Sequence, residues 1–342
     1  SKPAPLYSKK FANRIETGNF EDDMSKIKDY DWIIEVVIER LDIKKIVFEQ
    51  VEKYRKPGTL ITSNTSGIPI HLMLDGRSDD FKAHFCGTHF FNPPRYLKLF
   101  EIIPTPETKP EVIDFLMGYG KKILGKTTVL CKDTPAFIAN RIGVFAIMAL
   151  FHSVKDLGLT VDEVDKLTGP VLGRPKSATF RTADVVGLDT LVLVANGLKE
   201  NTPNDEANDL FTLPEYVGKM IENKWLGSKT KQGFYKKVKD ENGKSQILSL
   251  NLSTLEYEPK QRVKFPTLEL TKPITDLSER MQVLFNGKDK AGEFYRSVFT
   301  SFCLSLHIPG SFQVLLQLIG AVCSTMNNES GNGHDKSLDW KI

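Results

Sequence analysis

The hydrophobic positions of residues 32–131 follow two alternating patterns. WIIEVVIE (Trp32–Glu39) is almost continuously apolar, which is typical of a strand buried on both faces of a parallel sheet. The next segment, Asp42–Arg55, has apolar residues at helical spacing and ends at Pro57-Gly58. The alternation continues with predicted strands at Thr59–Ser63, His84–Phe91, Tyr96–Ile103 and Thr127–Cys131, and predicted helices at Pro69–Leu74 and Glu107–Ile123. Strands that alternate with helices predict an α/β fold built from βαβ units around a mostly parallel sheet.

The pattern changes near residue 134, and residues 134–236 are predicted to be mainly helical. Thr160 and Glu163 fit a capping box at the start of one of these helices. Asn242-Gly243 marks the turn of a β-hairpin in the next segment, which continues into a linker with a short helix. The predicted helices of this half are Phe137–Leu157, Asp184–Glu200, Pro214–Asn223 and Lys288–Ile308. We therefore divide the chain into four parts: 1–133, 134–236, 237–287 and 288–342.

Composition narrows the class of protein. Of the 342 residues, 40% are apolar and 26% are charged, which is ordinary for a globular protein. The net charge of +3 argues against a general nucleic-acid binder. The longest apolar runs fall short of the ~18 residues that a membrane span needs, so no span is expected. Four scattered cysteines without a CxxC pair, and no visible secretory leader, predict a reduced, cytoplasmic protein.

Two motifs suggest chemistry that their context does not favour. Gly120–Thr127 matches the phosphate-binding pattern GxxxxGK[ST], but that loop must follow a strand and open a helix, and here the order is reversed. The interpretation we favour is the end of a helix followed by the start of a strand. His84, Cys86 and His89 resemble a zinc cluster, yet His89 points to the opposite face of the strand and no further ligand lies nearby in the sequence.

Polar residues at the carboxyl ends of the strands are better candidates, because ligands of open α/β sheets bind there. Ser66 follows the strand Thr59–Ser63, His89 and Asn92 end the next strand, and Glu101 lies on the strand after that. A histidine beside a carboxylate is the usual arrangement for a general base near neutral pH. From spacing alone, a purely structural histidine is the commoner alternative.

Four segments together resemble the 3-hydroxyacyl-CoA dehydrogenase family, in its long bacterial multidomain form. They are SNTSGIPI (Ser63–Ile70), GTHFFNPPRYLKLFEIIP (Gly87–Pro104), KDTPAFIANRIG (Lys132–Gly143) and GSKTKQGFYK (Gly227–Lys236). The resemblance covers residues 9–236 and implies a partial Rossmann-like sheet followed by the helical C-terminal domain of the dehydrogenase. It implies NAD-dependent oxidation of 3-hydroxyacyl-CoA to 3-ketoacyl-CoA in fatty-acid β-oxidation. An acyl-CoA thioester is the implied substrate.

The resemblance also assigns roles to residues. His89 is the implied base, Glu101 its orienting carboxylate, and Ser66 and Asn140 hydrogen-bond the substrate oxygen. The implied cofactor contacts are Glu39, Lys44, Ser66, Asn92 and Lys229, and no metal site is expected. Structural alternatives stay open: Glu39 as a charge at a strand end, Lys44 as a charge on a helix surface, and Asn140 as a polar group at a helix start. The helical domains imply a homodimer or pairing within the chain.

One family feature has no counterpart in the sequence. The family opens with a strand and a GxGxxG loop that binds pyrophosphate, and no GxGxxG occurs in the 342 residues. No resemblance is visible from Pro309 onward. We therefore expect a chain truncated at the N-terminus and altered at the C-terminus, aggregation-prone through the edge of Trp32–Ile38 and with negligible dehydrogenase activity by itself. The alternative function is a catalytically silent fragment, at most a weak acyl-CoA-binding or dimerising piece.

Overall fold

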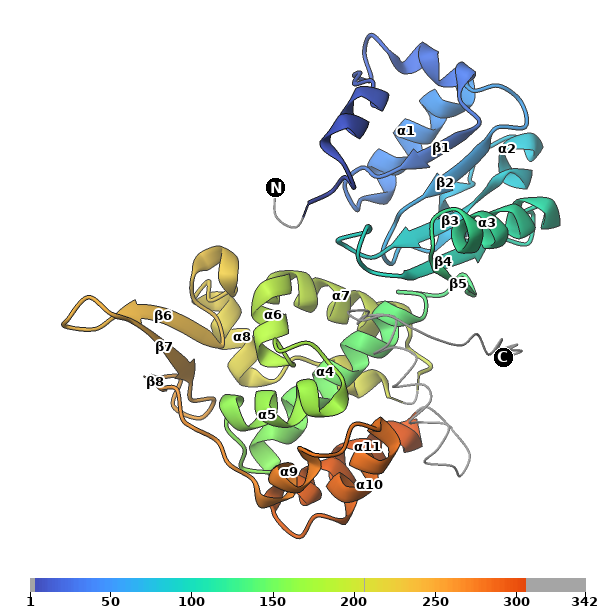
Figure 1. Cartoon of the computed structure of the whole chain (residues 1–342). Helices are drawn as coiled ribbons and strands as arrows, with labels where there is room; N and C mark the ends of the chain where they lie inside the picture. Colours follow the sequence, from blue (N-terminus) through green and yellow to red (C-terminus); the bar gives the residue numbers. More distant parts are fainter. Residues whose placement is uncertain (1–3, 206, 306–342) are drawn as a thin grey trace.

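The computed structural model of the chain describes residues 4–205 and 207–305, which form a sheet-containing part and a mainly helical part (Figure 1). The sheet-containing part opens with two 3₁₀ turns, η1 (Lys9–Arg14) and η2 (Met24–Asp29). Its strands are β1 (Trp32–Glu35), β2 (Leu60–Ser63), β3 (Phe85–Phe90), β4 (Leu99–Pro104) and β5 (Thr127–Leu130). Its remaining helical elements are α1 (Leu41–Tyr54), η3 (Ile70–Met73), α2 (Asp79–Ala83) and α3 (Pro110–Lys122).

The five strands lie in the order β1-β2-β3-β4-β5, so β1 is an edge strand of this sheet within the described residues. Neighbouring strands run parallel except β3 and β4, which are antiparallel. The predicted mostly parallel α/β sheet is confirmed, but an unbroken series of βαβ steps is wrong at this pair. Only eight residues, 91–98, separate β3 from β4, and a parallel crossover needs a dozen or more.

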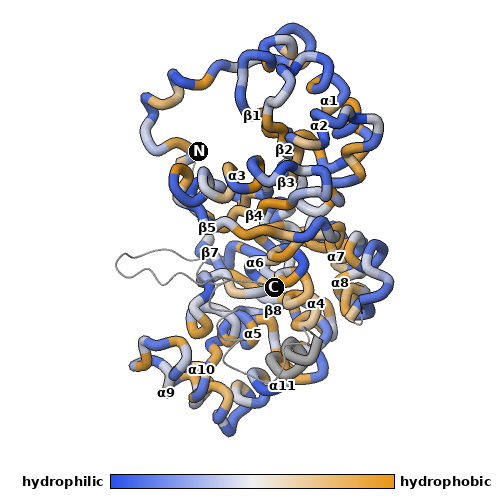
Figure 2. Tube along the Cα trace, turned by 90° about the vertical axis from the view of Figure 1, so that its right-hand side faces the viewer, coloured by the Kyte–Doolittle hydropathy of each residue, from blue (hydrophilic) through white to orange (hydrophobic). Residues whose placement is uncertain are grey.

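Each face of the sheet has its own apolar layer. Phe48 of α1 and Phe81 of α2 pack with Phe85 on one face, where all three side chains are fully buried. On the other face, Leu116 of α3 packs with Phe100 and Ile102 of β4. In Figure 2 the central strands are accordingly among the more hydrophobic segments, while the connecting loops are hydrophilic. Burial on both faces explains why β2, β3 and β4 are read from the sequence as apolar runs. The prediction that Trp32–Glu39 is a strand buried on both faces is wrong, because β1 is an edge strand that ends at Glu35, and Ile34 is 41% exposed.

The helical part surrounds one large apolar cluster, to which α4 contributes Phe145, Met148 and Phe151. The predicted capping box is confirmed: Thr160 Oγ1 accepts the N–H of Glu163, and the Glu163 carboxylate accepts the N–H of Thr160. The elements are α4 (Ala139–Asp156), α5 (Val161–Thr168), η4 (Pro170–Leu172), α6 (Phe180–Val186), α7 (Leu188–Asn201), η5 (Asn208–Phe211), α8 (Glu215–Glu222) and η6 (Ser228–Thr230).

Up to residue 305, the chain then forms a small antiparallel sheet and three more helices. The predicted hairpin turn at Asn242-Gly243 joins the first two strands. The elements are β6 (Tyr235–Lys239), β7 (Ser245–Leu250), β8 (Tyr257–Pro259), α9 (Pro266–Thr271), α10 (Leu277–Asn286) and α11 (Lys290–Ser305). The predicted helix Lys288–Ile308 corresponds to α11 up to residue 305, and the segment from 309 onward lies outside the described residues. Within the described residues, no helix is long and apolar enough to cross a membrane.

Candidate active site

The antiparallel pairing of β3 and β4 places His89 directly opposite Glu101. His89 Nδ1 lies 2.7 Å from Glu101 Oε2, so the predicted hydrogen bond between the two side chains is confirmed. Both side chains are almost completely buried. A buried carboxylate that accepts from Nδ1–H fixes the orientation of the ring and leaves the lone pair on Nε2. This arrangement suits a general base.

The second oxygen of Glu101 holds the start of the helical part. Glu101 Oε1 accepts the backbone N–H groups of Ile138 and Ala139, at 3.2 and 2.8 Å, where α4 begins. These N–H groups have no partner within the helix itself, so Glu101 caps α4 from a distant strand. One carboxylate therefore orients the histidine and anchors the neighbouring helix.

Asn140, in the first turn of α4, reaches back to the sheet. Its Nδ2 donates to the backbone carbonyl of Ser66 at 3.2 Å. The predicted proximity of Asn140 to Ser66 is thereby confirmed. Ser66 is exposed in the turn that follows β2, so its side chain is accessible at the carboxyl edge of the sheet.

Two aromatic rings flank the histidine, and the sequence analysis did not single them out. The ring of Phe91 lies 4.4 Å from that of His89, centroid to centroid, and the ring of Phe137 lies at 5.9 Å. Cys131 is also close: burial, and then the negative charge of Glu101, raise the pKa of its thiol above the ordinary value. The surroundings of His89 are therefore largely apolar, apart from Glu101.

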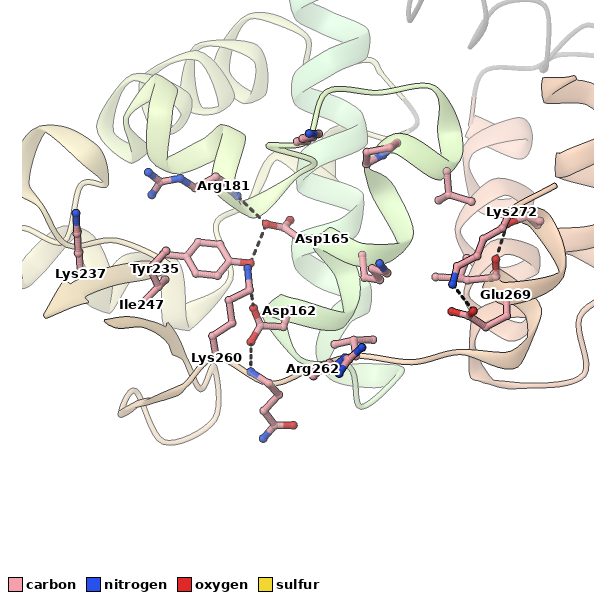
Figure 3. Close-up of a pocket in the computed structure, with 18 of the residues that line it drawn as sticks. Asp162, Asp165, Arg181, Tyr235, Lys237, Ile247, Lys260, Arg262, Glu269 and Lys272 are labelled. Atoms are coloured by element: carbon pink, nitrogen blue, oxygen red, sulfur yellow. Dashed lines mark hydrogen bonds and ion pairs between the residues drawn. The ribbon is translucent and has the colours of Figure 1, made fainter. Parts of the chain in front are cut away.

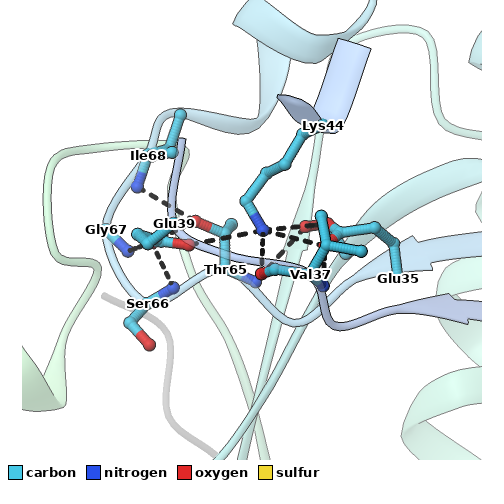
Figure 4. Close-up of polar contacts among 9 residues, drawn as sticks. Glu35, Val37, Glu39, Lys44, Thr65, Ser66, Gly67 and Ile68 are labelled. Atoms are coloured by element: carbon cyan, nitrogen blue, oxygen red, sulfur yellow. Dashed lines mark hydrogen bonds and ion pairs between the residues drawn. The ribbon is translucent and has the colours of Figure 1, made fainter. Parts of the chain in front are cut away.

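A buried ion-pair network supports the turn that carries Ser66 (Figure 4). Lys44 Nζ lies 2.9 and 3.1 Å from the two Glu35 oxygens and 3.3 Å from Glu39 Oε2. The side chains of Glu35 and Lys44 are each only 1% exposed. Glu39 Oε1 accepts from Thr65 Oγ1 at 2.6 Å and from the N–H of Ser66 at 2.9 Å. Glu39 thus holds the turn, and Lys44 holds Glu39.

The contacts of Lys44 bear on its implied role as a cofactor contact. Its ammonium also lies 3.3 Å from the carbonyl oxygen of Val37, so it is enclosed by oxygen atoms of the chain itself. Lys44 is also not a charge on the helix surface, because its side chain is buried. The geometry indicates that Lys44 acts through Glu39.

The remaining two candidates lie at different places. Asn92 is exposed in the loop after β3, three residues beyond His89. Lys229 lies in η6 of the helical part, where it forms an ion pair with Asp189. The hydrogen bond from Lys229 holds the pKa of Asp189 below its usual range. Among the described residues, no recorded hydrogen bond or ion pair links Lys229 to the residues around His89.

Asp133 is a further residue that the sequence analysis missed. Its carboxylate accepts the N–H groups of Ile70 and His71, at 2.6 and 2.9 Å, and lies 2.6 Å from His71 Nδ1. Asp133 thus ties η3, which follows the Ser66 turn, to the segment that leads into α4. Its partners lie 62 and 63 residues away in the sequence, so no local pattern could have indicated these contacts.

Comparison with known proteins identifies the family. Residues 2–134 match the model of the 3-hydroxyacyl-CoA dehydrogenase NAD binding domain, and residues 137–237 match that of the 3-hydroxyacyl-CoA dehydrogenase C-terminal domain. A probable 3-hydroxyacyl-CoA dehydrogenase of Deinococcus radiodurans is 49% identical over 247 residues, which are 72% of this chain and 70% of that protein. The chain belongs to this family. The resemblance inferred from the sequence motifs is therefore confirmed, including its NAD-binding domain.

A probable 3-hydroxyacyl-CoA dehydrogenase of Bacillus subtilis is 50% identical over 291 residues, or 85% of this chain. This chain spans only 36% of the length of that protein. Among solved structures, FadB2 of M. tuberculosis has a TM-score of 0.56 at 29% identity and matches 63% of this chain and 73% of its own. The (S)-3-hydroxybutyryl-CoA dehydrogenase PaaH1 of Ralstonia eutropha has a TM-score of 0.55 at 27% identity, over 61% of this chain and 71% of its own. The likeness to these dehydrogenases supports the α/β fold of the sheet-containing part.

Proposed function

We propose that this chain contributes the catalytic base and the substrate-facing residues of an NAD-dependent 3-hydroxyacyl-CoA dehydrogenase that acts in fatty-acid β-oxidation. The observation that carries the proposal is the buried hydrogen bond between His89 and Glu101 in a chain of this family. The family model alone would be compatible with a member that has lost its catalytic residues. The intact pair supports retention of the chemistry.

In the proposed mechanism, His89 Nε2 accepts the proton of the substrate 3-hydroxyl group while C3 becomes a carbonyl carbon. Glu101 accepts from Nδ1–H, so it favours the tautomer with a basic Nε2 and stabilises the imidazolium that forms. Ser66 and Asn140, which are joined through the Ser66 carbonyl, hydrogen-bond the reacting oxygen. Phe91 and Phe137 limit the access of water to the ring and so strengthen these polar contacts.

Bound NAD supplies the acceptor for the hydride that leaves C3. The polar groups at the edge of the sheet fit the ribose and the carboxamide of NAD, because these side chains can form hydrogen bonds and remain accessible. Ser66 and Asn92 are exposed, and the Glu39 side chain is 40% exposed. We propose that Glu39, Ser66, Asn92 and Lys229 contact the cofactor, whereas Lys44 positions Glu39. We also propose the boundary between cofactor and helical domains at residues 133 and 134.

The test uses the product of the complete gene, with the 342-residue chain measured beside it where the two differ. NADH formation from a 3-hydroxyacyl-CoA is followed by absorbance. We expect turnover by the complete product, and a loss of about 10²-fold or more in kcat for His89→Gln, with a small change in KM. His71→Gln serves as the matched control, because His71 is exposed and its side chain pairs with Asp133, not with His89 or Glu101.

An unchanged kcat in His89→Gln would remove His89 from the catalytic role. Absence of turnover in the complete product, with the wild-type residues in place, would contradict the proposed function. Because the 342 residues contain no GxGxxG loop, we expect this chain to show negligible activity by itself. Turnover by that chain at the level of the complete product would contradict that expectation and leave the mechanism standing.

A further inference from the structure

A large groove lies on the helical part (Figure 3), and His89 is not among the residues that line it. Its volume is about 1220 Å³, and its walls come from α5, the β6–β7 hairpin, the segment 260–263, and α9 and α10. None of the candidate residues of the active site lines it. A concave site of this size is large enough for a nucleotide-sized ligand.

The groove concentrates positive charge. Ten of its lining residues are Lys or Arg and three are Asp or Glu, an excess of seven positive charges, whereas the excess over the whole chain is three. The rest of the molecule must therefore carry more acidic than basic residues. Cations gathered in a concave surface between low-dielectric walls raise the local potential and attract anions.

The carboxylates of the groove are engaged by the chain itself. Asp165 accepts the N–H groups of Thr179, Phe180 and Arg181 and the hydroxyl of Tyr235. Asp162 accepts from the Ser249 hydroxyl and the Gln261 N–H. Glu269 is paired with Lys272. These acids therefore do little to neutralise the remaining cations.

Arg280 donates to backbone carbonyl oxygens, and six other cations form no ion pair with an acidic residue among residues 4–205 and 207–305: Lys166, Lys176, Lys231, Lys236, Lys237 and Arg262. All except Lys236 are exposed, and Lys236 Nζ lies 5.3 Å from the centre of the Tyr257 ring. A single phosphate carries at most about two negative charges, so it would match fewer than half of these cations. A ligand with several phosphate groups is the better match, because Lys and Arg both bind phosphate through charge-assisted hydrogen bonds.

Apolar groups lie beside the cations. Ile247 is paired with Lys237 across the hairpin and is 49% exposed, and Val263 follows Arg262 directly. An arginine plane and neighbouring aliphatic side chains form a surface on which a nucleobase can stack. We propose that this groove binds the polyphosphate portion of a nucleotide of the coenzyme A type, which carries a diphosphate and a further phosphate beside an adenine. The choice of coenzyme A as probe rests on the proposed function, whereas the charge argument does not.

Lysine footprinting tests the proposal at the groove itself. The wild-type chain is acetylated in the presence and absence of coenzyme A, and the modification of each lysine is measured by mass spectrometry. We expect coenzyme A to protect Lys231, Lys236 and Lys237, and pantetheine, which has the same thiol arm without phosphates, to protect none of them. The protection should weaken as salt is added.

A charge reversal with a matched control measures the contribution of the groove. Lys237→Glu should weaken the protection of Lys231 and Lys236 by at least about tenfold in coenzyme A concentration, because it replaces an attraction with a repulsion. Lys244→Glu changes the net charge equally at an exposed position in the turn of the same hairpin but does not line the groove. It should leave the protection within about twofold of wild type.

Three results would overturn the proposal: no protection by coenzyme A, equal protection by pantetheine, or protection only by vesicles of anionic phospholipid. The last result would assign the groove to a membrane surface. None of these measurements requires turnover. A negative result therefore leaves the proposed dehydrogenase function untouched, and an inactive enzyme leaves the groove proposal untouched.

Discussion

Replacing Lys44 with methionine tests how strongly the buried network stabilises the sheet edge. Methionine keeps most of the length and apolar stem of lysine but removes the ammonium. The Glu35 carboxylate would then remain buried, with the Ser63 hydroxyl at 2.5 Å and the Val37 N–H at 2.5 Å as its neighbours. Removing one partner of a buried ion pair typically costs about 3–5 kcal/mol. Against a total free energy of unfolding of about 5–15 kcal/mol, this is a large loss.

Lys45 is the matched control, because it is the adjacent residue of the same helix. Its ammonium pairs with Asp75 at 3.1 Å, but the two side chains are 37% and 82% exposed. A surface pair of this kind contributes about 0–1 kcal/mol. The assay is urea unfolding of the wild type, Lys44→Met and Lys45→Met, with the slope of each curve compared to confirm that the same transition is measured.

A double variant separates two costs of removing Lys44: the cost of leaving the Glu35 charge buried without a partner, and the loss of its attraction to the ammonium. Glu35→Gln combined with Lys44→Met leaves no buried charge without a partner, so it should be more stable than Lys44→Met alone. The reasoning would be refuted if Lys44→Met were no more destabilised than Lys45→Met. It would also be refuted if the two substitutions of the double variant simply added their costs.

Three further predictions concern other contacts. In Glu101→Gln, the side-chain amide has one oxygen, so it cannot accept from both His89 and the N–H groups at the start of α4 as the carboxylate does. The kcat of the complete gene product should therefore fall by about tenfold or more. An unchanged kcat would contradict this. Burial raises the pKa of Asp184 to about 6, so the native state binds this proton more tightly than the unfolded state. The free energy of unfolding should therefore decrease by up to about 3 kcal/mol as the pH rises from about 4 to about 6, and Asp184→Asn should lack this decrease; parallel pH profiles in urea titrations would refute it. Thr160→Ala should cost about 1 kcal/mol of stability through loss of the cap, and a loss below about 0.3 kcal/mol would contradict that role.

The regular elements were the most predictable features, because their signals are local. Apolar runs identified the strands, of which β2, β3 and β4 are buried on both faces, and the Thr160–Glu163 pair identified a helix start. The segment Asp184–Glu200 shows the limit of such signals. It was predicted as one helix but forms α6 and α7, which meet at Gly187 with a φ of +99°. Glycine adopts this conformation without a steric penalty, so one glycine in a helical pattern became a boundary.

The segment 253–285 was predicted as a linker with one short helix, yet it contains α9 and α10. Both starts had local signals. Pro266 occupies the first turn of α9, and Asp276 caps α10 by accepting the N–H of Glu279. The apolar residues between these signals are few, which made the helical periodicity weak. Here the chemistry of the helix ends was more informative than the hydrophobic pattern.

The role of Lys44 depends on burial, which a sequence does not show directly. Glu35, Glu39 and Lys44 look alike in sequence as charges near a strand end, but their side chains are 1%, 40% and 1% exposed. Ser63 adds a hydrogen bond to Glu35 from the neighbouring strand, at a position fixed only by the β1–β2 register. Charged residues are buried together only when tertiary packing brings oppositely charged partners into contact. The family resemblance could therefore suggest Glu39 and Lys44 as site residues, but not the ion pairs that they form.

The site around His89 depends on the same kind of long-range contact, and Glu101 is its centre. Strand direction decides that Glu101 faces His89, since only an antiparallel pair of β3 and β4 gives this register. The other Glu101 oxygen accepts from Ile138 and Ala139, so the position of α4 is coupled to the orientation of the imidazole. Asn140 adds a second connection through the Ser66 carbonyl. A displacement of the helical part would therefore weaken the hydrogen bonds of Glu101 and move a proposed substrate contact in the same step. Glu101 thus joins the proposed base to the start of α4, which links the fold of the helical part directly to the proposed chemistry.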